Sequence, residues 1–133
     1  MARRMYELTV RGEFEAAHRI VGYEGKCRRL HGHNWSVEAV VRGRELDRLG
    51  MLIDFKVLKG ALNGVLEELD HQYLNELETF ERMNPTAENL ARHIFERLSA
   101  STVIVESGAR VSAIKIYETA KSCVMYMPDE EAS

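Results

Sequence analysis

Three histidines have the residue type and the spacing that suit a metal ion. His31 and His33 are two residues apart in an alternating run, so both rings leave the same face of a strand. That face is the apolar one, which also carries Trp35. His18 ends an earlier alternating run, in phase with its apolar positions. A single histidine there would be a hydrogen-bonded core residue, but three imidazoles on paired strands form the donor set of a catalytic zinc site with an open position.

Cys27 lies four residues before His31 and has three interpretations. It could be a small buried hydrophobic residue, although the surrounding loop is polar. It could be the fourth ligand of a closed structural zinc site. It could also be a nucleophile or base, because Lys26, Arg28 and Arg29 flank it and neighbouring cations favour the thiolate.

Two further sets of titratable residues could complete such a site. Asp70 and His71 follow an amphipathic segment directly. If they face Cys27, the histidine can take the thiol proton while the aspartate orients the histidine. Glu118 is in phase with apolar residues of a strand, and a carboxylate there needs partners. It forms either a salt bridge at the strand end or an anchor for the N–H groups of a ligand.

Period-two alternation predicts the strands that carry these residues. Residues 6–18 and the run that starts at His31 form an expected antiparallel pair. Two more runs, 102–106 and 111–118, have strand character, the first because it is rich in β-branched residues. Residues 123–127 either extend the last strand or pair elsewhere.

Apolar residues three and four apart predict two amphipathic helices, over 55–69 and about 85–99. Asp54 is the expected N-cap of the first helix, and Asn84 or Thr86 that of the second. The order β-β-α-α-β-β predicts a single α+β domain over residues 1–133, a four-stranded antiparallel sheet with two helices on one face. The free edges of such a sheet favour pairing between subunits.

Composition excludes several classes of protein. The 133 residues carry 18 Lys and Arg against 21 Asp and Glu, a net charge of −3, which disfavours a dedicated nucleic-acid binder. Two cysteines are too few for a disulfide framework and are expected to be reduced thiols. No apolar run approaches the roughly 20 residues of a membrane span, and no signal peptide is visible. We therefore expect a cytoplasmic protein with no membrane partner.

Six short motifs, in this order, resemble those of the 6-pyruvoyltetrahydropterin synthase superfamily over about residues 6–126. They are Phe14-Glu15-Ala16-Ala17-His18, Cys27-x-x-x-His31-Gly32-His33, Ile53-Asp54-Phe55, Leu69-Asp70-His71-x-x-Leu74-Asn75, Asn84-Pro85-Thr86-x-x-Asn89 and Tyr117-Glu118-Thr119. The spacing of three residues between Cys27 and His31 is similar to that in the 6-carboxy-5,6,7,8-tetrahydropterin synthases of queuosine biosynthesis.

The resemblance implies a tunnelling fold, in which trimers close their sheets into a barrel and two trimers stack into a homohexamer with interfacial active sites. It implies a lyase that acts on 7,8-dihydroneopterin triphosphate, a small pterin, and releases acetaldehyde and triphosphate. It also implies Zn²⁺ as the cofactor.

The resemblance assigns roles to residues as well. The implied zinc ligands are His18, His31 and His33. The implied catalytic residues are Cys27, which abstracts the proton, its partners Asp70 and His71, and Glu118, which also anchors the pterin. Thr86 matches a position that contacts the pterin.

Three other functions remain open at this stage. Within the superfamily, the chain could be a pyruvoyl-forming synthase or a dihydroneopterin aldolase-like variant. In a different class, it could be a non-catalytic interaction module stabilised by zinc, with Cys27 as the fourth ligand. A zinc hydrolase that uses bound hydroxide is the last alternative, and nothing in the sequence favours it.

Overall fold

The first two expected strands pair antiparallel along their whole length. The computed structural model describes residues 3–23 and 29–129, with β1 at Tyr6–His18 and β2 at His31–Gly43. Their register runs from Tyr6 opposite Gly43 to His18 opposite His31. Because side chains alternate between faces, this register buries one side of both strands and exposes the other.

The sheet has five strands and is mixed, so the expectation of a four-stranded antiparallel sheet is wrong. The strand order is β3-β1-β2-β4-β5, with β3 at Gln72–Tyr73, β4 at Arg110–Thr119 and β5 at Ser122–Tyr126. The short β3 pairs parallel with β1, opposite Ala16 and Ala17. It forms because the chain after the first helix returns along the outer edge of β1, and Glu15 binds it there through its backbone N–H and C=O.

The expected strand over 102–106 is also wrong, since helix α3 spans Thr102–Ser107. Its β-branched residues have strand propensity, but local packing decides the outcome. Ser101 precedes the helix, Ile104 is buried, and Gly108 ends the helix with φ of +76°, a left-handed conformation that suits glycine.

The C-terminal run supplies a strand, β5, in place of the one expected over 102–106. β5 folds back on β4 as an antiparallel partner, the second of the two arrangements expected for 123–127. Its face away from the helices is open, so Cys123 is exposed and Met125 and Met127 are 47% and 55% exposed. The packing roles that their residue types suggest are therefore not filled within this chain.

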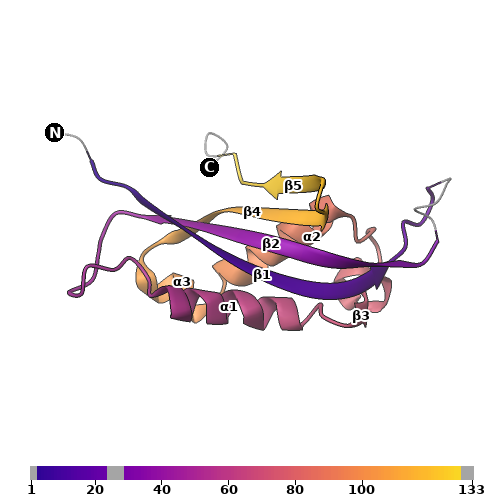
Figure 1. Cartoon of the computed structure of the whole chain (residues 1–133), viewed down its shortest axis with the longest axis horizontal. Coiled ribbons are helices and arrows are strands. Elements are labelled where there is room, and N and C mark those ends of the chain that lie inside the picture. The colour runs from indigo at the N-terminus through magenta and orange to yellow at the C-terminus, as the bar shows by residue number, and fades with distance from the viewer. Residues whose placement is uncertain (1–2, 24–28, 130–133) are drawn as a thin grey trace.

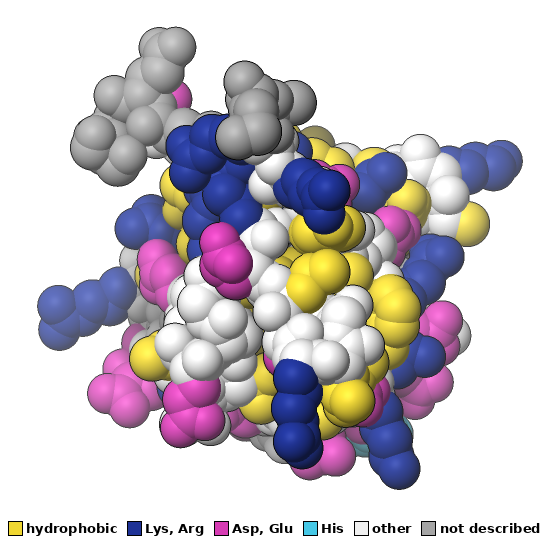
Figure 2. All heavy atoms as spheres, turned by 90° about the vertical axis from the view of Figure 1, so that its left-hand side faces the viewer, with side chains coloured by type: hydrophobic (Ala, Val, Ile, Leu, Met, Phe, Trp, Pro, Cys, Tyr) yellow, Lys and Arg dark blue, Asp and Glu magenta, His cyan; other side chains and the backbone are white. Residues whose placement is uncertain are grey.

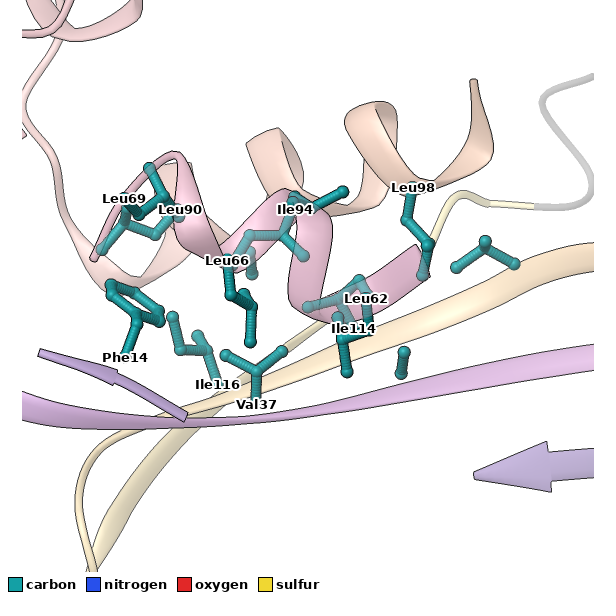
Figure 3. Close-up of a cluster of buried hydrophobic side chains, with 14 of the residues drawn as sticks. Phe14, Val37, Leu62, Leu66, Leu69, Leu90, Ile94, Leu98, Ile114 and Ile116 are labelled. Carbon is teal, nitrogen blue, oxygen red and sulfur yellow. The ribbon is translucent and has the colours of Figure 1, made fainter. Parts of the chain in front are cut away.

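Both amphipathic helices form and cover one face of the sheet (Figure 1). Helix α1 spans Phe55–Glu67, and Asp54 accepts a hydrogen bond from the N–H of Lys56. Helix α2 spans Ala87–Ser99, and its N-cap is Thr86, whose hydroxyl accepts from the N–H of Asn89 at 3.1 Å. Two short 3₁₀ turns, Leu74–Glu76 and Glu78–Phe80, lie between these helices. The core fills the space between helices and sheet, with Phe14, Val37, Leu62, Leu66, Ile94, Ile114 and Ile116 among its members (Figure 3).

The opposite face of the sheet carries no helix of the described residues (Figure 1). We call it the open face. Its side chains are mostly charged or polar, and include Glu7, Arg11, Glu15, Glu38 and Lys115. A sheet that is apolar on one side and polar on the other needs no second helical layer in water.

The end of the molecule where β1 begins and β2 ends bears scattered hydrophobic side chains among charged ones (Figure 2). Leu46 and Leu49, in the loop between β2 and α1, are among the exposed apolar residues. Single exposed residues of this kind are ordinary on a folded protein. In the described part of the chain, no helix combines the length and the apolarity that a bilayer crossing requires.

Helix α1 packs tightly against β1 at Gly12. A Cβ there would lie 2.7 Å from Leu66 Cδ1 and 3.0 Å from Asn63 Oδ1. We expect Gly12→Ala to lower the free energy of unfolding by about 1–3 kcal/mol, because the added methyl group overpacks this contact. Urea unfolding at a fixed metal concentration measures the change.

Gly64 is the matched control, since a Cβ at this position in α1 meets no atom within 4 Å. Gly64→Ala should stabilise the protein by about 0.5–1 kcal/mol, because alanine loses less backbone entropy on folding. Equal effects of the two substitutions would contradict a tight contact at Gly12.

Candidate metal centre

The three histidines meet where β1 ends and β2 begins. His18 and His31 are direct cross-strand partners, and His33 follows two residues later on the same face. The ring centroids are 4.5 Å apart for His18 and His31, 4.6 Å for His31 and His33, and 5.2 Å for His18 and His33. His18 is only 2% exposed, so the site lies at the edge of the core. The convergence expected from strand pairing is confirmed.

Backbone carbonyls fix the orientation of two of these rings. Nδ1 of His18 lies 2.7 Å from the carbonyl oxygen of Pro85, and Nδ1 of His31 lies 2.7 Å from that of Arg29. A carbonyl can only accept a hydrogen bond, so each Nδ1 carries the proton. Each Nε2 therefore keeps its lone pair, the arrangement in which an imidazole binds a metal.

Glu118 joins the histidines on the same side of the sheet. Its Oε1 lies 2.9 Å from Nε2 of His33, 3.3 Å from that of His18 and 4.0 Å from that of His31. The four potential ligand atoms lie within 4.8 Å of one another. The sequence predicts Glu118 to be an anchor or a salt-bridge partner. It does not predict that this carboxylate lies beside all three imidazoles.

The environment of the donor atoms fits a divalent metal. Nε2 of His18 and Nε2 of His33 are buried, and among the described residues neither makes a hydrogen bond, although Glu118 Oε1 lies within 3.3 Å of both. Buried polar atoms are nearly always satisfied, and a metal would satisfy both. Burial lowers the pKa of His33, with further lowering by the other two histidines and an opposing effect of Glu118. The neutral imidazole that a metal needs is thus favoured at neutral pH.

Two asparagines hold the segment that follows His18. Asn75 accepts from the N–H of Arg19 and donates to its carbonyl, both at 2.8 Å. Asn84 makes the same pair of bonds with Val21, both at 2.9 Å. Each amide side chain therefore acts like a neighbouring strand. The sequence alone offered Asn84 as a possible N-cap of the second helix, a role that Thr86 fills, and gave Asn75 no role. An amide that binds backbone has no distinctive spacing.

Thr86 lies next to Pro85, the residue whose carbonyl orients His18. The hydroxyl of Thr86 accepts the N–H of Asn89, while the Asn89 side chain donates to the carbonyl of Asn84 at 2.8 Å. The segment from Asn84 to Asn89 therefore caps α2 and holds Pro85, whose carbonyl orients His18.

Asp70 and His71 form a second chemical group, at the edge of β1. Asp70 Oδ1 accepts the N–H of Glu15 at 2.9 Å, and Oδ2 lies 3.0 Å from His71 Nδ1. The bond from Glu15, followed by the contacts with His71, lowers the pKa of Asp70 and keeps it ionised. His71 has φ of +59°, a strained conformation for a residue with a side chain.

The second ring nitrogen of His71 faces another carboxylate. Its Nε2 lies 3.4 Å from Oε2 of Glu15, a residue that points to the open face. Among the described residues, the ion pairs of His71 are with Asp70 and Glu15, and His71 is not a member of the four-residue metal cluster. Cys27 lies outside the described residues, so its contact with this pair stays a prediction.

The fold and the histidine cluster define an α+β protein whose paired strands carry a group of side chains that could hold a metal ion. A sequence model described as 6-pyruvoyl tetrahydropterin synthase matches residues 7–129, and the chain belongs to this family. Among solved structures, the 6-pyruvoyl tetrahydropterin synthase of Caenorhabditis elegans has a TM-score of 0.83 at 27% identity, covering 97% of this chain and 99% of that chain.

Curated relatives carry a more specific name. A 6-carboxy-5,6,7,8-tetrahydropterin synthase of Synechocystis sp. is 37% identical, over 85% of this chain and 86% of its own. The one of Bacillus subtilis is 34% identical, over 92% and 86%. A dihydroneopterin monophosphate aldolase of Pyrococcus furiosus is 43% identical over a shorter region, 66% of this chain and 70% of its own.

Replacing a ligand should remove the metal. We expect His33→Ala to weaken Co²⁺ or Zn²⁺ binding by more than roughly 100-fold, the upper end of the loss typical for residues that only orient a ligand. Isothermal titration of the metal-free protein measures this. His93→Ala is the control, because His93 packs against Phe80 in another part of the fold. Equal metal affinity of the two variants would contradict the site.

Proposed function

We propose that the protein is a zinc-dependent lyase that forms 6-carboxy-5,6,7,8-tetrahydropterin. The substrates are 7,8-dihydroneopterin triphosphate and one water molecule, and the other products are acetaldehyde and triphosphate. The observation that carries this proposal is the convergence of three oriented imidazoles beside Glu118. The names of the relatives from Synechocystis sp. and Bacillus subtilis support the product. The proposal includes a place in queuosine or other 7-deazapurine biosynthesis.

His18, His31 and His33 would hold the zinc ion through their Nε2 atoms. When bound, zinc supplies a Lewis acid that polarises side-chain oxygens of the substrate and acidifies the adjacent C–H and O–H bonds. The protein would supply the base, and we assign this role to Cys27. A thiolate is competent at neutral pH because its proton affinity is close to what such a base requires.

Glu118 and Thr86 are assigned to the pterin ring. A carboxylate matches the N–H groups on the guanidine-like edge of the pterin and can accept two of them. Glu118 Oε1 lies within 3.3 Å of two ligand nitrogens, which would keep an anchored ring close to the metal donors. Thr86 caps α2 through its oxygen, so its O–H proton is still available to a ligand.

Asp70 and His71 would receive the thiol proton. The ionised Asp70 binds Nδ1 of His71 and so directs Nε2 toward the proton donor. Within one chain, that nitrogen faces Glu15 and not the metal centre. We therefore propose that the pair serves a thiol of a neighbouring subunit, in a barrel of trimers that stack into a hexamer. The polar open face and the uncovered edge of β5 support such pairing.

Incubation of the zinc-loaded protein with 7,8-dihydroneopterin triphosphate tests the reaction. We expect acetaldehyde and 6-carboxy-5,6,7,8-tetrahydropterin in equal amounts, with activity lost on chelation and restored by Zn²⁺. Mass spectrometry identifies the pterin, and a coupled dehydrogenase assay measures acetaldehyde. A pyruvoyl pterin without acetaldehyde would refute the proposal.

A second candidate function follows from the Pyrococcus furiosus relative, whose name is that of an aldolase acting on a phosphorylated pterin. Retro-aldol cleavage would release a two-carbon aldehyde that keeps the phosphate. Acetaldehyde carries no phosphate, so the same incubation separates the two reactions. Phosphorylated glycolaldehyde among the products would favour the aldolase.

Replacing the proposed base separates a catalytic site from a structural one. Cys27→Ala should leave one zinc ion bound per chain and reduce turnover by about 100-fold or more, because proton transfer loses its base. Metal analysis of the purified variant and its rate measure the two effects. Loss of zinc from this variant would instead support the non-catalytic, zinc-stabilised interaction module, in which Cys27 is a ligand.

A further inference from the structure

A basic hollow lies directly beyond the metal centre. It has a volume of about 540 Å³ and is lined by Arg19, Arg29, Leu30 and Tyr73. Among the residues that the structure describes, its lining contains two guanidinium groups and no carboxylate. In the part of the chain that the structure describes, neither Arg19 nor Arg29 forms an ion pair. Four other arginines do have carboxylate partners, namely Arg11, Arg42, Arg92 and Arg97.

The two arginines that line this hollow lie close in sequence to the proposed metal ligands. Arg19 directly follows His18, and both of its backbone polar groups are bound by Asn75. The carbonyl of Arg29 holds the ring of His31. Because His18 and His31 are cross-strand partners, the two arginines extend from the end of the strand pair on which the imidazoles converge.

Tyr73 lines the hollow from the neighbouring strand. It lies in β3, opposite Ala17 of β1, and its side chain is half-buried. Besides the two guanidinium groups, the phenol of Tyr73 offers a neutral hydrogen-bond donor. Leu30 contributes an apolar wall. Two forked cations and a hydroxyl, with no acidic group among the described lining residues, match the oxygens of phosphate esters better than those of any neutral ligand.

We propose that this hollow binds the phosphoryl groups of the substrate and of the departing triphosphate. The assignment rests on the proposed function, in which the reacting carbons of the side chain lie at the metal. The phosphate ester is attached to the last carbon of that short side chain, so it must lie beside the metal centre. The arginines bind phosphoryl oxygens electrostatically and form no covalent bond. The bond that breaks is the one between the side-chain carbon and the ester oxygen, whose electron pair leaves with the triphosphate.

Arginine-to-glutamine variants test this subsite. Arg19→Gln and Arg29→Gln should each raise KM for 7,8-dihydroneopterin triphosphate by about tenfold or more, since a charge-assisted hydrogen bond is lost. Inhibition by inorganic tripolyphosphate should weaken by a similar factor. Inhibition by 7,8-dihydroneopterin, which lacks the phosphates, should not change. Arg19→Lys should recover part of the loss.

Arg48→Gln is the matched control, because Arg48 is an exposed arginine in the loop at the other end of β2. It should keep the KM and both inhibition constants of the unsubstituted protein. Zinc content is measured for every variant, so that a disturbed His31 is distinguished from a lost phosphate contact. Unchanged KM and tripolyphosphate inhibition in both glutamine variants would overturn the proposal.

Calorimetric binding of tripolyphosphate to the zinc-loaded protein separates this subsite from the proposed reaction. If the protein does not turn over the pterin, the proposed function fails. Tripolyphosphate binding that Arg19→Gln and Arg29→Gln abolish would still support a polyphosphate site. If turnover occurs but tripolyphosphate binds all variants equally, only the subsite is refuted.

Discussion

The register between β1 and β2 is the constraint on which the candidate site depends. His18 faces His31 only in the observed pairing, and a shift of one residue would turn His31 and His33 to the open face. The core holds this register. Phe14 and Trp35 are cross-strand partners whose rings stack at 5.9 Å, and the Trp35 indole donates to the Ala16 carbonyl at 3.3 Å. Metal geometry and core packing are therefore set by the same contacts.

Segments far from the strand pair complete the orientation of the ligands. The carbonyl of Pro85 fixes His18, and Asn75 and Asn84 fix the chain that follows it. These partners come from the region between α1 and α2, which is assembled only in the folded protein. Metal affinity must therefore include part of the free energy of folding, since the donors are not arranged in the unfolded chain.

Alternation and residue type were sufficient to predict the strand pair, both long helices and the three histidines. They failed where the outcome depends on long-range packing or on backbone groups. The segment Thr102–Ser107 has strand propensity but forms a helix, and β3 is too short to leave a periodic pattern. Glu118 was placed on the correct face, but its distance to the histidines depends on β4 lying beside β2, and strand order is not encoded in periodicity.

The edges of the sheet give the proposed assembly a physical reason. β3 pairs with β1 only at Ala16 and Ala17, so most of the outer edge of β1 has no partner strand among the described residues. β5 forms the other edge and exposes Met125 beside it. An unpaired edge on each side of the sheet is a hazard for a lone subunit, and joining the two edges removes both. Such closure would place the carboxylates and cations of the open face inside a barrel. It would also leave Asp70 and His71, which are bound to the edge of β1, at the seam between two subunits.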